Sequence, residues 1–326
     1  MHPADVREND FFTRSYAMPV WILVLLLLLV NFVWGSTIIV MKILFDVVTP
    51  MQAMLCRVGL AGVIYACLWK KVRVPIHKGD GKWLLLLALC EPALQLTFVS
   101  TGLNYTTASQ TGAIYAFQPL MAAVGAYIFC RERINFRCLS GMAVAIMGVV
   151  LVSLLGKATA AAPAPVFGNF LVLISVAAAA SFMLILKRLS PRYPFLFLCA
   201  VQSIVGTVYF IIPASLDPLP VSMTAQAWAA LLFLGLGPGF GVYLIYNYAL
   251  TRLKAAHVGL FSNLIPVFSL LLAYLILGER LEPLQYMGAL LVLCGVIWAG
   301  SPEQVDASND TPLTSQRSTA CDTKLS

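Results

Sequence analysis

The chain has 326 residues, of which 60% are hydrophobic and only 11% are charged. Soluble domains carry roughly 25% charged residues, so this composition excludes an ordinary water-soluble globule and predicts a multi-pass membrane protein surrounded by lipid bilayer. The net charge of +7 does not indicate a nucleic-acid partner, because the cations lie in short loops between apolar runs and form no basic patch.

Ten apolar segments follow a mixed-charge polar tail at residues 1–18, and a second tail at 301–326 carries too little apolar surface to fold alone. Segments of about 18 to 24 residues cross a ~30 Å hydrocarbon core as helices. The first segment is too long for a cleaved signal peptide and lacks a small-residue cleavage pattern. The expected fold class is therefore all-α, with ten transmembrane helices at 19–41, 50–69, 83–101, 107–129, 138–155, 166–186, 194–213, 226–248, 257–277 and 284–300.

The chain contains one of its own stretches twice. Residues Leu103–Val149 align without a gap on Leu250–Val296, about 147 residues later. Chance rarely places Pro, Tyr, Glu-Arg and two Gly in one register, so the alignment predicts an internal duplication into five-helix units at 19–155 and 166–300. The identical positions in the first copy are Leu103, Ala108, Gly112, Pro119, Ala126, Tyr127, Glu132, Arg133, Gly141, Gly148 and Val149.

The distribution of cations predicts the orientation. The loops after the second, fourth, sixth and eighth segments hold thirteen Lys and Arg residues, whereas the alternate loops hold three, Lys42, Lys157 and Arg280. This bias predicts that both termini lie in the cytoplasm. We expect the membrane that the chain crosses to be the cell's inner membrane. Because each unit has an odd number of helices, the second unit must enter the membrane upside down. Inverted repeats of this kind generate alternating access to a site between the two halves.

These features resemble the EamA-type transporters of the drug/metabolite transporter superfamily, over residues from about 20 to 300. The resemblance rests on NFVWGS at 31–36, on Arg57 in LCRVGLAG, on LNYTTAS from Leu103, and on the Pro119…Glu132 and Pro266…Glu279 segments with the glycine pairs that follow them. It implies inverted five-helix repeats around a central cavity lined by helices 1, 3, 4, 6, 8 and 9. Members mostly export small metabolites, amino acids or drugs, and some import. One departure is Arg131, where the second copy has Gly278; it predicts a differently capped end of the fourth helix.

Glu91 is the only acidic residue inside any apolar segment. An ionised carboxylate in hydrocarbon is costly, so Glu91 should face a cavity, form a pair or take up a proton, as a proton-coupled carrier requires. Pro92 follows it directly and is expected to interrupt the third helix, while Gly237-Pro238-Gly239 occupies the matching place in the second unit. Interruptions at corresponding points of two halves indicate a binding site.

Two interpretations of Glu91 stay open. It either handles substrate or protons, or forms a buried structural pair with Arg57, which is the only cation well inside an apolar segment. Both can hold if the pair breaks during transport. For Arg57 itself we favour a structural role, because the second helix lies outside the cavity in the family's fold.

Further polar and aromatic residues are candidates for contact with a solute. Asn31 and Trp34 share a face of the first helix. Gln95 and Phe98 extend the face of Glu91, and the prolines Pro119 and Pro266 follow polar residues in the fourth and ninth helices. Amides and aromatic rings around one carboxylate suit a small amphipathic solute such as an amine or an amino acid. The remaining candidates are Tyr115, Gln118, Tyr243, Tyr246 and Asn263.

The function expected from the sequence is therefore a secondary transporter, with an exporter of small organic solutes favoured and a possible coupling to protons through Glu91. An uncoupled facilitator or an importer of the same solutes is the alternative. An intramembrane enzyme acting on lipid-linked substrates is remote, because a single intramembrane carboxyl gives no convergent acid–base set. The scattered histidines and cysteines predict neither a metal site nor a cofactor. A homodimer is compatible with the sequence.

Overall fold

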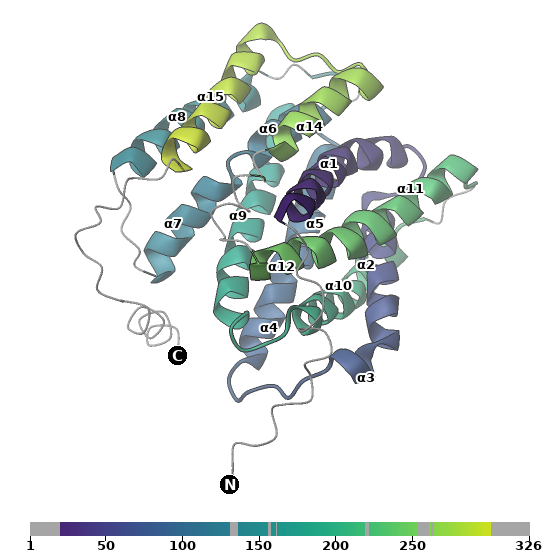
Figure 1. The fold of residues 1–326 in the computed structure, drawn as a ribbon. Helices are drawn as coiled ribbons and strands as arrows, with labels where there is room; N and C mark the ends of the chain where they lie inside the picture. Colours follow the sequence, from purple (N-terminus) through teal and green to yellow (C-terminus); the bar gives the residue numbers. More distant parts are fainter. Residues whose placement is uncertain are drawn as a thin grey trace, which may run out of the picture.

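The computed structural model describes residues 20–130, 136–155, 158–160, 162–218, 222–252, 261 and 264–300. Apart from an isolated bridge between Thr159 and Ala162, these residues form helices and connecting turns, with no strand among them (Figure 1). The fold is therefore all-helical over the described ranges, as the composition predicts.

The described residues of the first half form eight α-helices and one π-helical turn. In chain order they are α1 (Val20–Leu44), α2 (Pro50–Cys67), α3 (Trp69–Val72), α4 (Gly81–Ala88), the π-turn η1 (Leu89–Leu94), α5 (Gln95–Leu103), α6 (Ala108–Tyr115), α7 (Gln118–Cys130) and α8 (Phe136–Leu154).

The second half repeats this order. Its described elements are α9 (Pro165–Leu189), α10 (Phe195–Leu216), α11 (Ala225–Leu236), η2 (Gly237–Gly241), α12 (Val242–Arg252), α14 (Leu264–Leu272), η3 (Ala273–Leu277) and α15 (Pro283–Gly300). Across the described residues of both halves, six helices are long and apolar enough to cross a bilayer, and three more apolar helices are shorter. The long ones are Trp21–Leu44, Pro50–Cys67, Gly81–Leu103, Pro165–Leu189, Phe195–Leu216 and Ala225–Tyr246.

Threonine starts three of these helices. Thr49, Thr107 and Thr224 each adopt extended backbone angles, and each side-chain oxygen accepts a hydrogen bond from the amide three residues later. This bond satisfies one of the amides that a helix start leaves without a partner. Local sequence thus fixes where α2, α6 and α11 begin.

The interruptions predicted from Pro92 and Gly237-Pro238-Gly239 are present in both halves. α4 and α5 are joined by η1, in which Glu91 has non-helical backbone angles of −146° and 122°. α11 and α12 are joined by η2 at the corresponding place. Proline donates no backbone hydrogen bond, so both rods open where it occurs.

The predicted span 107–129 is not one continuous helix. α6 ends at Tyr115 and α7 starts at Gln118, with a tight turn in which the Phe117 amide donates to the Ile114 carbonyl at 3.0 Å. Pro119 causes this break, because its ring nitrogen has no hydrogen to donate to the Tyr115 carbonyl four residues before it.

Contacts between the halves follow the duplication. α1 packs against α12 and α14, and the matching helix α9 packs against α5 and α7. α2 packs against α11, and its counterpart α10 packs against α4. The pairs α2–α10 and α8–α15 join matching helices directly. Exchanging the halves therefore reproduces the same set of contacts, which places an approximate two-fold relation through the centre of the bundle.

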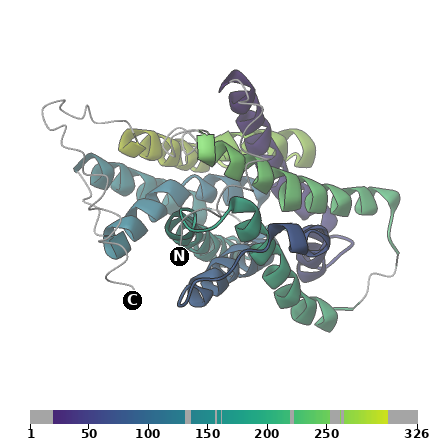
Figure 2. The same cartoon turned by 60° about the horizontal axis from the view of Figure 1, so that its bottom comes forward.

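α8 and α15 lie side by side at one edge of the molecule in both views (Figures 1 and 2). Their closest approach uses the glycines that the two repeats share. A Cβ on Gly148 would overlap the carbonyl oxygen of Gly288, and one on Gly295 would overlap that of Gly141. Because residue numbers rise along α8 as they fall along α15, the two helices are antiparallel. Small residues allow such close backbone contact between membrane helices.

Gly148→Ala is therefore expected to lower the midpoint of thermal unfolding by a few degrees. Overpacking costs about 1–3 kcal/mol, which exceeds the roughly 0.5–1 kcal/mol that alanine gains over glycine in a helix. Gly81→Ala is the matched control, because a Cβ there meets no atom within 4 Å. Equal stability of the two variants would contradict this packing.

Candidate functional site

A central cavity lies between the two halves. It contains about 1170 Å³ of space not occupied by atoms, part of which is open to solvent. Spaces between the helices of a bundle are a common place for small-molecule sites. Its walls come from α1, α2, η1, α5, α6, α7, α9, α12 and α14.

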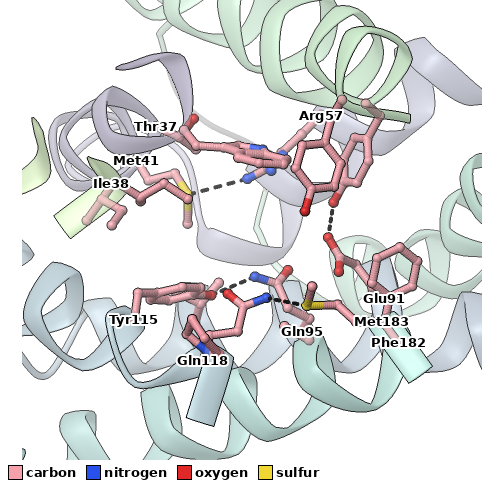
Figure 3. Close-up of a pocket in the computed structure, with 17 residues that line it drawn as sticks. Thr37, Ile38, Met41, Arg57, Glu91, Gln95, Tyr115, Gln118, Phe182 and Met183 are labelled. Atoms are coloured by element: carbon pink, nitrogen blue, oxygen red, sulfur yellow. Dashed lines mark hydrogen bonds between the residues drawn. The ribbon is translucent and has the colours of Figure 1, made fainter. Parts of the chain in front are cut away.

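Glu91 lines this cavity at the break of the α4–η1–α5 rod and is 9% exposed. Its carboxylate accepts a hydrogen bond from the hydroxyl of Tyr243 on α12 (Figure 3). Its backbone carbonyl accepts one from Gln202 Nε2 on α10 at 3.1 Å. The interrupted helices of the two halves therefore meet through Glu91 and Tyr243.

Three aromatic side chains, including Tyr243, form a cluster in the cavity wall. Trp34 on α1 makes edge-on ring contacts with Tyr246, at 4.9 Å between centroids, and with Tyr243, at 6.1 Å. All three rings line the cavity. Aromatic faces attract cations, so this part of the wall suits a positively charged group.

A hydrogen-bonded chain forms the opposite wall. Gln95 Nε2 donates to the Tyr115 hydroxyl at 2.6 Å (Figure 3). That hydroxyl also lies 2.8 Å from Ser175 Oγ on α9. Ser175 Oγ in turn donates to the Gln95 carbonyl at 2.9 Å. Gln118 lies beside this chain and donates to Met183 Sδ at 3.5 Å. Gln95 Oε1 is buried and has no hydrogen-bond partner among the described residues.

Arg57 also lines the cavity, although it lies on α2. Its side chain is 6% exposed, and Nη1 donates to Met41 Sδ at 3.9 Å. Across the described residues Arg57 forms no ion pair with Glu91. In this conformation Glu91 is held by Tyr243 instead. The cavity thus contains one buried cation and one buried anion that are not paired with each other.

The structure does not bring every candidate to the cavity. Asn31 is 1% exposed and donates to the Leu27 carbonyl at 2.6 Å, away from the lining. Phe98 is half-buried outside the lining, and Val99 takes its place. The wide turn of η1 explains this shift, because it moves the face of Glu91 to positions 95 and 99. Asn263 lies outside the described residues.

The candidate prolines fall into two groups. Pro119 lines the cavity at the α6–α7 break. Pro92, Pro238 and Pro266 are buried in the interrupted or packed parts of η1, η2 and α14. Pro92 packs against Gly206 of α10, where a Cβ would overlap the proline ring. The absence of a side chain at Gly206 therefore leaves space for the kink.

For several lining residues, nothing in the sequence distinguishes them from ordinary residues of a packed core. Ala179, Phe182 and Met183 form the α9 wall, together with Ile265 of α14. On α1, however, Thr37, Ile38 and Met41 follow Trp34 at helical spacing. Continuing the periodicity from Trp34 would have found that face.

One end of the bundle is tied by two charged side chains. Lys42 Nζ of α1 donates to the carbonyls of Leu103 and Thr106, at 2.7 Å each. Glu279, which follows η3, accepts from the amides of Ala108 and Ser109 at 3.1 and 2.9 Å, and from Ser109 Oγ at 2.9 Å. A carboxylate at a helix N-terminus is stabilised by the free amides and the helix dipole. We call this set of contacts the Lys42–Glu279 tie.

The duplicated Glu-Arg pairs are thus only partly described. Glu279 caps α6, a helix of the other half. Gly278 before it has a φ of +64°, a left-handed conformation that glycine adopts without strain. Arg131 and Glu132, at the matching place of the first half, lie outside the described residues.

The sequence was compared with known families. A model of the EamA-like transporter family matches residues 21–154 and, a second time, residues 166–301. The chain belongs to the EamA-like transporter family. The two matches correspond to the two halves whose contacts repeat in the fold, so the duplication is a property of this family's architecture.

Relatives of this EamA-family chain carry transporter names. It is 24% identical to the uncharacterized transporter YetK of Bacillus subtilis, over 80% of this chain and 82% of YetK. It is 25% identical to a protein of Streptantibioticus cattleyicolor named "Probable terminal-alkyne amino-acid exporter", over 85% of this chain and 92% of that one. An 18% identical crystal structure has a TM-score of 0.58, covers 84% of this chain and 95% of its own, and shares the fold.

These findings establish an integral, multi-pass membrane protein of a transporter family. The names of the family and of its relatives indicate a transporter, which is not an enzyme class. Small-molecule solutes and membrane lipid are the partners that such a family implies.

Proposed function

We propose that the chain is a secondary active transporter that exports small organic solutes carrying an amino group, with the central cavity as its binding site. The cavity's aromatic wall beside Glu91 supports an amino group in the solute. The relative named as an amino-acid exporter supports the same solute class and the direction of transport.

The proposed topology has ten spans in two inverted units, 19–155 and 166–300. Each interrupted rod counts as one span: α4–η1–α5, α6–α7, α11–η2–α12, and a ninth span that ends with α14 and η3. The antiparallel packing of α8 and α15 supports the inversion, because these are the last helices of the two units. The cation bias supports cytoplasmic termini in an inner membrane. With this orientation, the Lys42–Glu279 tie lies at the outer end of the bundle.

Alternating access follows from this arrangement. In the present conformation the Lys42–Glu279 tie holds α1, α6 and the end of η3 together at the proposed outer end. Release of solute to that side requires these contacts to break, and rocking of one half against the other would break them while contacts form at the opposite end.

The observation that carries the proposed coupling is the position of Glu91. A buried carboxyl lies at the break of a helix in one half and is contacted by Tyr243 from the matching broken helix of the other half. An ammonium group and a proton compete for such a carboxylate. If each displaces the other, proton entry on one side drives solute release, which is the exchange that an exporter needs.

Counterflow in proteoliposomes tests the proposed function. Vesicles containing the full chain and loaded with a pool of unlabelled amino acids and amines should accumulate a labelled member of that pool above the level in protein-free vesicles. Accumulation without any response to a pH gradient would favour the uncoupled facilitator. No accumulation of any pool member would contradict transport of this solute class.

A further inference from the structure

Arg57 is a buried charge that forms no close ion pair among the described residues, although Glu91 lies in the same cavity. Its side chain is 6% exposed, and its hydrogen-bond partner is the Met41 sulfur at 3.9 Å, a weak acceptor. No carboxylate lies within 4 Å of it in the described ranges. Leaving a buried guanidinium unpaired is costly, so this is the point of the cavity where an anionic group of a ligand gains most.

The backbone of Arg57 is held firmly. A Cβ on Gly239 of η2 would overlap the Arg57 carbonyl oxygen, so the interrupted helix of the second half packs directly on α2 at this residue. On the other side, Thr207 Oγ1 of α10 donates a hydrogen bond to the Val58 carbonyl at 3.3 Å. These contacts fix the backbone from which the guanidinium extends, and a guanidinium can bind a carboxylate through two parallel hydrogen bonds.

Glu91 supplies the opposite charge in the same cavity. Among the residues that line it, Arg57 and Glu91 are the two that carry charge, one of each sign (Figure 3). The carboxylate of Glu91 accepts a hydrogen bond from Tyr243, whose ring belongs to an aromatic cluster with Trp34 and Tyr246, and this setting suits an ammonium group. The lining charges sum to zero, which matches a ligand that carries one positive and one negative group.

Another part of the wall is apolar. It consists of aliphatic, thioether and aromatic side chains from α1, α5, α9 and α14, namely Ile38, Met41, Val99, Phe182, Met183 and Ile265. Methionine side chains adapt to ligands of different shape. This part of the cavity would receive an uncharged, apolar portion of the ligand.

We infer that the cavity binds zwitterionic α-amino acids with an apolar side chain, with Arg57 holding the carboxylate and Glu91 the ammonium group. This inference rests on the proposed function of the cavity as the transport site and narrows its solute class. A simple amine would leave Arg57 unpaired, and a polyanion would meet Glu91. Arg57 thereby becomes a specificity residue in place of the structural role expected from the sequence.

The test compares three ligands that differ in one group each. Leucine, leucinamide, which lacks the carboxylate, and 4-methylpentanoate, which lacks the amino group, are titrated calorimetrically at pH 7 into the full-length protein in lipid nanodiscs. We expect the wild type to bind leucine about tenfold more tightly than either analogue, or better, because each analogue leaves one buried charge unpaired. Arg57→Gln should bring leucine and leucinamide within about twofold of each other while leucine still binds better than 4-methylpentanoate.

Two further variants separate recognition from folding. Arg57→Lys keeps the charge without the planar fork and should retain an intermediate preference for leucine over leucinamide. Arg73→Gln, which removes an exposed arginine in the loop after α3, should match the wild type. Wild-type binding of leucine and leucinamide with equal affinity, no binding of leucine, or an equal loss of all three ligands in Arg57→Gln would overturn the inference.

Counterflow of labelled leucine distinguishes this inference from the proposed function. If leucine binds with the expected preferences but does not move, transport fails and the binding assignment stands. If leucine moves and leucinamide competes with it equally well, transport stands and the role of Arg57 fails.

Discussion

Glu91→Gln is expected to abolish efflux driven by a pH gradient while leaving solute exchange at equal pH. Glutamine keeps the size and the hydrogen-bond acceptor that Tyr243 uses, but it cannot release a proton. Coupling by competition between a proton and an ammonium group at this position is then lost. The measurement is the rate of efflux of labelled leucine from proteoliposomes, with and without an imposed pH gradient. In Glu91→Gln we expect the ratio of the two rates to fall to about one.

Asp46→Asn is the control for this variant, because it removes an exposed carboxylate outside the cavity. Tyr243→Phe adds a graded case: it keeps the carboxyl but removes the hydroxyl that positions it, so it should weaken the stimulation without removing it. An unchanged gradient response in Glu91→Gln would show that Glu91 is structural and that the protein is a facilitator.

Glu279→Ala is expected to open the proposed outer end of the bundle. The variant removes the acceptor of three hydrogen bonds at the start of α6, including two backbone amides. Loss of such a cap costs about 1–2 kcal/mol, which corresponds to a five- to thirtyfold shift in a two-state equilibrium. The population open to the outside should therefore rise by a factor in that range.

Labelling of a single cysteine measures this shift. Thr37→Cys, placed in the cavity wall, is introduced after the eight native cysteines have been replaced by alanine. A membrane-impermeant maleimide added outside should react faster when Glu279→Ala is present. Glu282→Gln, an exposed residue of the same loop, should leave the rate unchanged. Equal rates in all three proteins would contradict a gating role for the tie.

Much of the fold could be predicted because the relevant signals are local or repeated. Apolar length indicates spans, and the duplicated register indicates two units. Pro92 and Pro238 mark the breaks because a missing amide hydrogen has the same consequence in any helix. The shared glycines were recognisable as repeats, but their packing of α8 against α15 requires knowing which helices are neighbours.

The site was predicted only in part, for physical reasons. Glu91, Trp34 and Tyr243 stood out because buried charge and deep aromatic rings are unusual in an apolar helix. Phe98 lies outside the cavity lining because a π-turn changes the number of residues per turn, which spacing alone does not show. Arg57 reaches the cavity from α2 since its long side chain crosses the space between helices, and no periodicity encodes that reach.

The same limit applies to Glu279. Its partners lie about 170 residues earlier, at Ala108 and Ser109, where a helix of the other half begins. A carboxylate binds the nearest free helix start, and only the arrangement of the two halves decides which start that is.

The central claim is that a proton and an amino group exchange at Glu91. Proton movement driven by solute alone tests it most directly. Proteoliposomes containing a pH-sensitive dye and the wild-type chain are given leucine on one side with no imposed pH gradient. The account predicts that leucine flux drives protons in the opposite direction, and that Glu91→Gln shows leucine exchange without any pH change. Leucine flux through the wild type with no accompanying proton movement would contradict it.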